Sequence, residues 1–182
     1  PIVSEAFVFL VNKDNPVDNL TLDQVRKIYT GEITNWKEVG GSDVAIRAMQ
    51  RPVNSGSQTG FLDLVMNGLT VMEPPVEWVS GDMGGLIDMV AHYDNQPDAI
   101  GYSYYYYVTD MVANPNVKLL KINGIAPTSA TISDSTYPIH TNYFAVFNSK
   151  EAVDSDVRKI VAYLLTDEGQ DLVEAAGYVR LK

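Results

Sequence analysis

The feature of this sequence that most constrains its fold is the alternation of short apolar runs with segments of helical periodicity. Residues 6–11 (AFVFLV) indicate a buried strand, and residues 22–30 carry apolar side chains at helical spacing between a Thr21–Gln24 capping box and Gly31. Further strand-like runs occupy residues 44–49, 76–79, 99–103, 117–122 and 142–147. Such alternation favours an α/β fold with a mainly parallel sheet and helices on both faces.

Helices are predicted at four further places in the chain. One begins near Gln58, and a second follows residues 80–82 with an apolar stripe at Leu86, Ile87, Val90 and Ala91. The most regular amphipathic stripe comes later, and consists of Val157, Ile160, Val161, Leu164 and Leu165. A last helix is expected to begin after a Thr166 cap and to end at Gly177, which suits a left-handed terminal position.

Composition excludes several classes of protein. The 182 residues are 46% hydrophobic and 20% charged, as in globular proteins, and the longest apolar runs fall far short of the roughly 20 residues of a membrane-spanning helix. The formal net charge is −10 and the 13 Lys and Arg residues are scattered, so no nucleic-acid surface is expected. Cysteine is absent, which excludes disulfides, thiolate metal sites and a cysteine nucleophile.

A polar loop at residues 51–59 has the chemistry of an oxyanion site. It leads into a predicted helix, whose first N–H groups carry partial positive charge, and it joins an arginine to hydroxyl and amide donors. The candidate ligand-binding residues are Arg51, Asn54, Ser55, Gly56, Ser57, Gln58 and Thr59. From composition alone, an ordinary capped turn beside a surface arginine explains the loop equally well. No G-x-x-x-x-G-K-[ST] pattern occurs, so nucleotide hydrolysis is not expected.

Catalytic and metal sites find little support. The only histidines, His92 and His140, lie far apart without metal-binding spacing, and no G-x-S-x-G pattern surrounds Ser55 or Ser57, which leaves a serine hydrolase as a distant alternative. Four aspartates lack the spacing of a calcium loop and are expected to be solvated, namely Asp82, Asp88, Asp94 and Asp98. We therefore expect no catalytic residue, no metal and no cofactor.

Residues 102–107 (YSYYYY) form the most aromatic segment of the chain. They could stack bases or sugars, but a strand would send only alternate rings to one face, and tyrosines are common at half-buried edges. We therefore interpret the run as a sheet edge.

Several ordered motifs resemble the PstS-like phosphate-binding proteins of phosphate ABC transporters, in the type II periplasmic binding protein superfamily. Residues 20–41 (LTLDQVRKIYTGEITNWKEVGG) contain the family's F/Y-x-G-x-I-x-x-W turn, and Arg51 stands four residues before Ser55-Gly56. Further matches are the AIGY strand at residues 99–102, Tyr137-Pro138, and the closing segments at residues 169–170 and 177–179. The resemblance spans nearly the entire chain.

The resemblance implies non-enzymatic capture of phosphate, or of a related tetrahedral oxyanion, for an ABC transporter permease in an extracytoplasmic location. It implies that Arg51, Ser55 and Gly56 contact the anion, and that Ser57 replaces the family's usual threonine. Val53 stands where many members carry an acidic residue that accepts a hydrogen from the anion, so discrimination between phosphate and sulfate is in doubt. A sensor or interaction module that has lost transport is the alternative.

The resemblance also implies a division into lobes. Residues 13–140 are expected to form the second lobe and to carry the anion loop, while residues 1–12 and 141–182 supply crossing strands and C-terminal helices of a partial first lobe. Roughly the first third of a typical family member, including any lipid-anchored N-terminal segment, is expected to lie upstream of this sequence.

Overall fold

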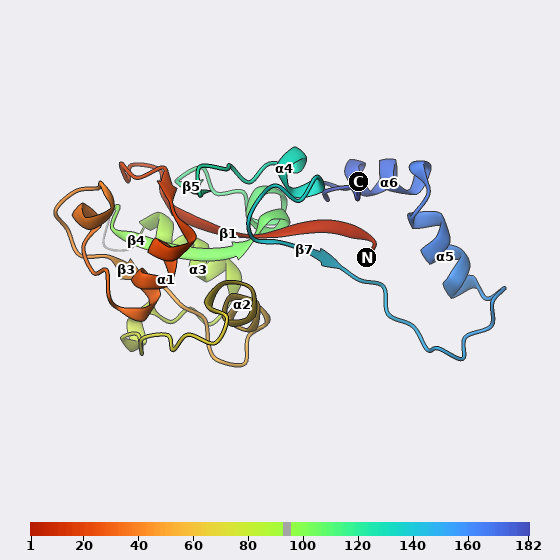
Figure 1. The fold of residues 1–182 in the computed structure, drawn as a ribbon, viewed down its shortest axis with the longest axis horizontal. Helices are drawn as coiled ribbons and strands as arrows, with labels where there is room; N and C mark the ends of the chain where they lie inside the picture. The colour runs from red at the N-terminus through yellow and green to blue at the C-terminus, as the bar shows by residue number, and fades with distance from the viewer. Residues whose placement is uncertain (93–95) are drawn as a thin grey trace.

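Strand β1 (Val3–Asn12) is the centre of the larger sheet in the computed structural model, which describes residues 1–92 and 96–182 (Figure 1). It pairs antiparallel with β4 (Ala99–Tyr104), β5 (Val117–Leu119) and β7 (His140–Tyr143). The short β3 (Arg47–Ala48) joins β4 in parallel, giving the order β3-β4-β1-β5 with β7 also on β1. A separate pair joins β2 (Asn19–Leu20) to β6 (Lys121–Ile122).

The prediction of a mainly parallel sheet is wrong. All three partners of β1 run antiparallel to it, and only β3 and β4 are parallel within this sheet. The reason is that a helix between two strands favours parallel pairing only when those strands become neighbours. The neighbours of β1 come instead from distant parts of the chain, so the local strand–helix pattern does not determine their direction.

Four predicted strands differ from the structure. Residues 76–79 form a 3₁₀ turn, η3 (Val76–Trp78), after two prolines, which cannot donate to a strand ladder. The run at 142–147 leaves the sheet after Tyr143, and Phe144 and Val146 are exposed. The run at 117–122 is divided between β5 and β6, which belong to different sheets, while the run at 44–49 keeps only two residues in β3.

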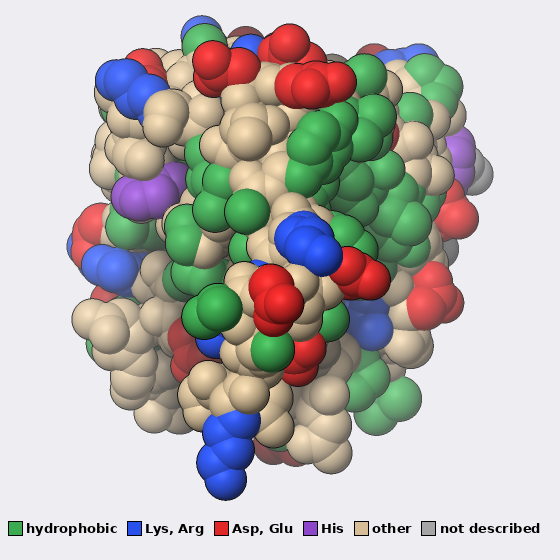
Figure 2. Space-filling view, turned by 90° about the vertical axis from the view of Figure 1, so that its right-hand side faces the viewer, with side chains coloured by type: hydrophobic (Ala, Val, Ile, Leu, Met, Phe, Trp, Pro, Cys, Tyr) green, Lys and Arg blue, Asp and Glu red, His purple; other side chains and the backbone are tan. Residues whose placement is uncertain are grey.

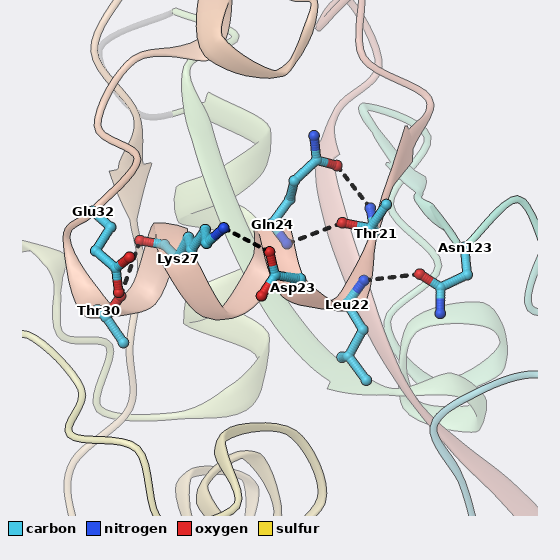
Figure 3. A network of polar contacts seen from close by, with 8 residues as sticks. All are labelled: Thr21, Leu22, Asp23, Gln24, Lys27, Thr30, Glu32 and Asn123. Atoms are coloured by element: carbon cyan, nitrogen blue, oxygen red, sulfur yellow. Dashed lines mark hydrogen bonds and ion pairs between the residues drawn. The ribbon is translucent and has the colours of Figure 1, made fainter.

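Helix α1 (Leu22–Thr30) forms as the sequence predicts (Figure 3). The Thr21 hydroxyl accepts from the Gln24 N–H at 3.1 Å, and the Gln24 side chain accepts from the Thr21 N–H at 2.8 Å. Gly31 closes the helix at φ 81°, in the left-handed region that glycine adopts without strain. These bonds satisfy backbone groups that a helix leaves unpaired at its ends.

Helical segments cover both faces of the sheet, as predicted. Successive strand residues point to opposite faces of the sheet, so the neighbours of Gly101 and Tyr102 in β4 identify the helix that packs on each face. A Cβ on Gly101 would lie 2.6 Å from Leu86 of α3 (Met83–His92), whereas the Tyr102 ring stacks on Phe61 at 4.5 Å between centroids. Phe61 begins the π-helical segment η2 (Phe61–Met66), which continues α2 (Gly56–Gly60).

The remaining helices are short or lie near the C-terminus. They are η1 (Trp36–Val39), η5 (Tyr107–Met111), α4 (Ser129–Ser133), α5 (Asp156–Leu164) and α6 (Asp167–Ala175). Thr166 caps α6, and Gly177 has φ 88°, both as predicted. None of the helices within residues 1–92 and 96–182 combines the length and apolarity needed to cross a membrane.

The apolar stripe of α5 is not buried. Its side chains at Val157 and Ile160 are 43% and 60% exposed, and Leu165 just beyond the helix is 51% exposed. Residues 144–155 loop away from the sheet before α5 (Figure 1), and hydrophobic side chains gather on this end of the molecule (Figure 2). The pattern correctly predicts the helix, but the described residues leave its apolar face exposed.

Candidate anion-binding site

The loop at residues 51–55 leads directly into α2, which begins at Gly56 rather than near Gln58 as predicted. Ser55 is the N-cap, with extended backbone and a hydroxyl that accepts from the Gln58 N–H at 3.2 Å. The Ser55 N–H donates to the Pro52 carbonyl at 2.9 Å, which closes the turn. The first N–H groups of a helix have no partner inside it, so this cap leaves donors at Gly56 and Ser57 for another acceptor.

Gln58 fixes the loop from inside the protein. Its side chain is buried, and its Oε1 accepts from the Arg51 N–H at 3.2 Å and from the Tyr102 hydroxyl. Its Nε2 donates to the Gln50 side chain at 3.3 Å. These contacts occupy the Gln58 amide, and the Arg51 N–H also donates to the Tyr102 hydroxyl of β4 at 3.0 Å.

The Arg51 guanidinium is only partly satisfied by the protein. Its Nη2 donates to the Gly81 carbonyl at 3.2 Å, just before α3 begins. Its Nε and Nη1 are buried and have no hydrogen-bond partner among the described residues. Because an unpaired buried donor costs about 1–3 kcal/mol, an anion that accepts from these nitrogens would be stabilised here.

A pocket of about 380 Å³ opens beside this arginine. It brings together Arg51, Gly56 and Ser57 of the predicted set. The Ser57 side chain is 3% exposed, and its hydroxyl has no partner among the described residues. The pocket is lined by Arg51, Gly56, Ser57, Met83, Tyr104, Tyr106, Tyr107, Met111, Tyr143 and Tyr178.

The other predicted site residues do not line the pocket. Ser55 and Gln58 hold the loop, as described above. Asn54 is exposed, and the Thr59 hydroxyl donates to the Ser55 carbonyl at 3.2 Å. Val53 is 77% exposed and does not line the pocket, and a valine side chain has no hydrogen-bond acceptor.

Five tyrosines form most of the pocket's remaining surface, and we call them the tyrosine wall: Tyr104, Tyr106, Tyr107, Tyr143 and Tyr178. The sheet-edge interpretation of residues 102–107 missed this grouping. Strand β4 ends at Tyr104 and the chain then becomes helical, so the following rings do not alternate between faces. The Tyr106 and Tyr178 rings stack with centroids 3.8 Å apart, which joins this segment to the chain's last residues.

A buried carboxyl group, Glu5, lies next to the tyrosine wall and was not singled out in the sequence. Glu5 is 1% exposed, and its Oε1 accepts from the Ala6 N–H at 2.8 Å and the Tyr106 N–H at 3.4 Å. Burial raises the pKa of Glu5, and these hydrogen bonds oppose the rise only in part. The pKa of Tyr143 is also raised, first by burial and then by the nearby Glu5 charge.

The histidines do not form a catalytic arrangement with the loop serines. His92 ends α3 with its Nε2 3.4 Å from the Asn116 amide, and His140 is the first residue of β7. Neither histidine lines the pocket, and no base contacts the Ser57 hydroxyl within the part of the chain that the structure describes. The same residues contain no group of three or more His, Cys, Asp or Glu side chains that could hold a metal ion.

The expectation that four aspartates are solvated is wrong for Asp98. Asp98 is 3% exposed, and its carboxylate pairs with Arg47 Nε at 3.0 Å, far away in the sequence, which compensates for the lost hydration. Asp82 and Asp88 are exposed, and Asp82 accepts from the Gly85 N–H at 2.7 Å in the first turn of α3. Asp94 lies outside the described residues.

Comparison with protein families places the chain among binding proteins. A family model described as PBP superfamily domain matches residues 1–168. The phosphate-binding protein PstS of Borreliella burgdorferi is 29% identical over 98% of this chain and 64% of its own length. PstS of Bacillus subtilis is 31% identical over 87% of this chain and 52% of its own length. The chain thus spans about half to two thirds of these relatives.

Solved structures agree with this fold. A Clostridium perfringens protein with bound phosphate, provisionally described as a phosphate ABC transporter substrate-binding protein, superimposes with a TM-score of 0.78 and 30% identity. The match covers 100% of this chain and 70% of that one. An ABC-type phosphate transport receptor of Vibrio cholerae gives a TM-score of 0.73 at 28% identity, over 98% of this chain and 70% of that one.

Proposed function

Because this chain belongs to the PBP superfamily, with residues 1–168 matching its model, we propose that it captures phosphate or a related tetrahedral oxyanion without chemical turnover. The observation that carries the proposal is the pocket at the start of α2, where two Arg51 nitrogens and the Ser57 hydroxyl are buried donors without partners among the described residues. Relatives named as phosphate-binding proteins, and one structure with bound phosphate, support the choice of anion.

In this proposal, Arg51, Gly56 and Ser57 contact the anion, and Ser55 and Gln58 hold the loop in shape. Each charge-assisted hydrogen bond contributes about 1.5–3 kcal/mol. The net charge of −10 opposes an anion at long range, but at physiological salt the field is screened beyond roughly 8 Å. A few local donors therefore outweigh the distant charge.

Selectivity between phosphate and sulfate is expected to be weak at this loop. A protonated phosphate differs from sulfate by a hydrogen that it can donate, and a carboxylate next to the arginine would accept it. Val53 offers no such acceptor and is 77% exposed. The loop donors alone favour any tetrahedral oxyanion of suitable size.

We further propose that the site belongs to one lobe of a two-lobe protein. Residues 13–140 form the lobe with the anion loop, and residues 1–12 and 141–182 belong to the other. The exposed apolar stripe of α5 supports this division, because such a face is normally covered (Figure 2). The same division is supported by the chain's length, since the chain covers 64% or less of the length of these curated relatives. The whole protein would deliver its anion to an ABC transporter permease outside the cytoplasm.

Isothermal titration of phosphate and of sulfate into the purified chain tests the function. Arg51→Ala is expected to remove most of the binding, because Arg51 is the only cationic residue among the described residues that line the pocket. Arg180→Ala is the matched control, since Arg180 pairs with Asp171 at the surface outside the pocket. Binding that survives Arg51→Ala would show that the anion sits elsewhere. Phosphate monoester hydrolysis that depends on Ser57 would support the hydrolase alternative instead.

A further inference from the structure

The buried carboxyl of Glu5 lies on the same face of the sheet as the candidate pocket. Residues opposite each other in an antiparallel pair share a face, and so do alternate residues along one strand. Strand β1 pairs Val3 with Tyr143 of β7 and Phe7 with Tyr104 of β4, and Glu5 lies midway between Val3 and Phe7. Tyr104 and Tyr143 both line the pocket. Glu5 therefore projects from the face that carries these two tyrosines.

Tyr106 connects the Glu5 carboxyl to the pocket. The Tyr106 N–H donates to Glu5 Oε1 at 3.4 Å, and Tyr106 itself lines the pocket together with Arg51. The Ala6 N–H donates to the same carboxyl oxygen at 2.8 Å. The second oxygen, Oε2, is buried and has no hydrogen-bond partner among the described residues. The carboxyl is thus held one tyrosine away from the proposed position of the anion.

Glu5 has no cationic partner among the described residues. It forms no salt bridge within residues 1–92 and 96–182. The ionisable groups on its side of the sheet are Tyr104, Tyr106, Tyr143, Tyr178, Asp63 of η2 and, in the pocket, Arg51. His140 pairs with Ala6 and therefore faces the other side, and α4, which also contacts β1, contains no ionisable side chain. Arg51 is thus the only cation in this group.

A bound oxyanion would act on this carboxyl through space. Burial raises the pKa of Glu5 from its ordinary value of 4.5, and a second negative charge in the pocket would raise that pKa further. At an effective protein dielectric of about 20, two unit charges about 10 Å apart change an equilibrium constant roughly tenfold. Glu5 is already 1% exposed in this chain, so a lobe that closed over the pocket would only exclude more water and strengthen the repulsion.

We propose that Glu5 couples anion binding to proton uptake, so that the oxyanion at Arg51 and Ser57 is held more tightly while the Glu5 carboxyl is protonated. The coupling is reciprocal, because an anion that favours the protonated carboxyl must itself bind better to that form. The proton passes from solvent to a Glu5 oxygen, and no bond within the anion changes. The inference rests on the proposed anion function and adds a pH-dependent regulation to that site.

The first test compares anion affinities of the parent chain and two variants from pH 4 to 8, by isothermal titration of phosphate and of sulfate. Glu5→Gln replaces the carboxyl by a neutral group of the same shape. Glu77→Gln removes the same charge from an exposed residue outside the pocket and is the matched control. The protonation of phosphate itself is common to all three proteins and cancels in ratios of affinity.

The affinity of Glu5→Gln relative to the parent chain is expected to be near one at the acidic end. It should rise to about tenfold at pH 8, where the parent carboxyl is ionised and repels the anion. The ratio for Glu77→Gln should stay within about twofold of one at every pH, because exposed charges are screened by salt.

The second test measures proton uptake in the parent chain and needs no substitution to fold. Sulfate is titrated in two buffers of different ionisation enthalpy, and since sulfate itself does not change protonation between pH 4 and 8, any proton taken up belongs to the protein. Uptake is expected in the parent chain and not in Glu5→Gln. With phosphate, the same quantity is the difference in uptake between these two proteins.

The outcomes separate this inference from the function on which it rests. Anion binding with a constant Glu5→Gln to parent ratio across the pH range would overturn the coupling but leave the anion site standing. Proton uptake that persists undiminished in Glu5→Gln would also overturn it, since another group would then take the proton. Failure of both phosphate and sulfate to bind the parent chain would refute the anion site, and this inference with it.

Discussion

Replacing Ser57 by alanine is expected to have opposite effects on stability and on binding. The Ser57 hydroxyl is buried and has no hydrogen-bond partner among the described residues. Removing an unpaired buried hydroxyl relieves a desolvation cost of about 1–3 kcal/mol, and alanine fits the first turn of a helix. The variant should therefore unfold at equal or higher urea concentration than the parent chain.

The same substitution removes a donor that we propose contacts the anion. Loss of one charge-assisted hydrogen bond costs about 1.5–3 kcal/mol, so phosphate affinity should fall about tenfold to a hundredfold. Ser103→Ala is the matched control, because Ser103 is also fully buried with an unpaired hydroxyl but does not line the pocket. It should preserve phosphate affinity.

Urea unfolding followed by circular dichroism, together with titration of phosphate, measures both effects. A decrease of more than about 1 kcal/mol in the free energy of unfolding of Ser57→Ala would show that the hydroxyl has a structural partner. Unchanged phosphate affinity would show that the hydroxyl does not contact the anion.

Three further predictions concern Glu5, Gly101 and the lobes. Burial raises the folded-state pKa of Glu5 above 4.5, so the stability gained from the protonated carboxyl is fully present below pH 4.5 and is lost as pH rises through the folded-state pKa. Glu5→Gln should remove this pH-dependent loss of stability in urea unfolding measured from pH 4 to 8. An unchanged pH dependence in the variant would contradict this prediction. Gly101→Ala should cost about 1–3 kcal/mol in free energy of unfolding, because its Cβ would lie 2.6 Å from Leu86, while Gly81→Ala, with open space around it, should cost little. This chain should bind phosphate roughly a hundredfold more weakly than the longer Clostridium perfringens relative, since a closed cleft adds charge-assisted bonds from the first lobe. Equal affinities in parallel titrations would show that the rest of the first lobe contributes nothing.

Local signals in the sequence predicted the longer helices, but not the short helical segments η1, η3, η5 and α4. Thr21, Gln24 and Gly31 specify both ends of α1 through hydrogen bonds within a few residues, so the pattern alone is sufficient. The strand at Ala99–Tyr104 was also predicted, because it is a short apolar run buried on both faces. Strand direction was not predicted, since the pairing of β1 with β4, β5 and β7 is decided by contacts between distant segments.

The candidate site was only partly predictable for the same reason. Arg51, Gly56 and Ser57 lie within one loop and helix start, so sequence placed them together, and the structure has them in one pocket. Their role in binding an anion stays a prediction. The tyrosine wall was missed because Tyr143 and Tyr178 come from the far end of the chain. The burial of Asp98 was missed because its partner, Arg47, lies on another segment.

A crystal structure of this chain grown with saturating phosphate would show directly where the anion binds. We expect an anion at the start of α2, within hydrogen-bond distance of the Arg51 guanidinium and the Ser57 hydroxyl, with the Ser55 cap unchanged. An anion bound at another surface, with Arg51 still directed only to the Gly81 carbonyl, would contradict the site and the function built on it.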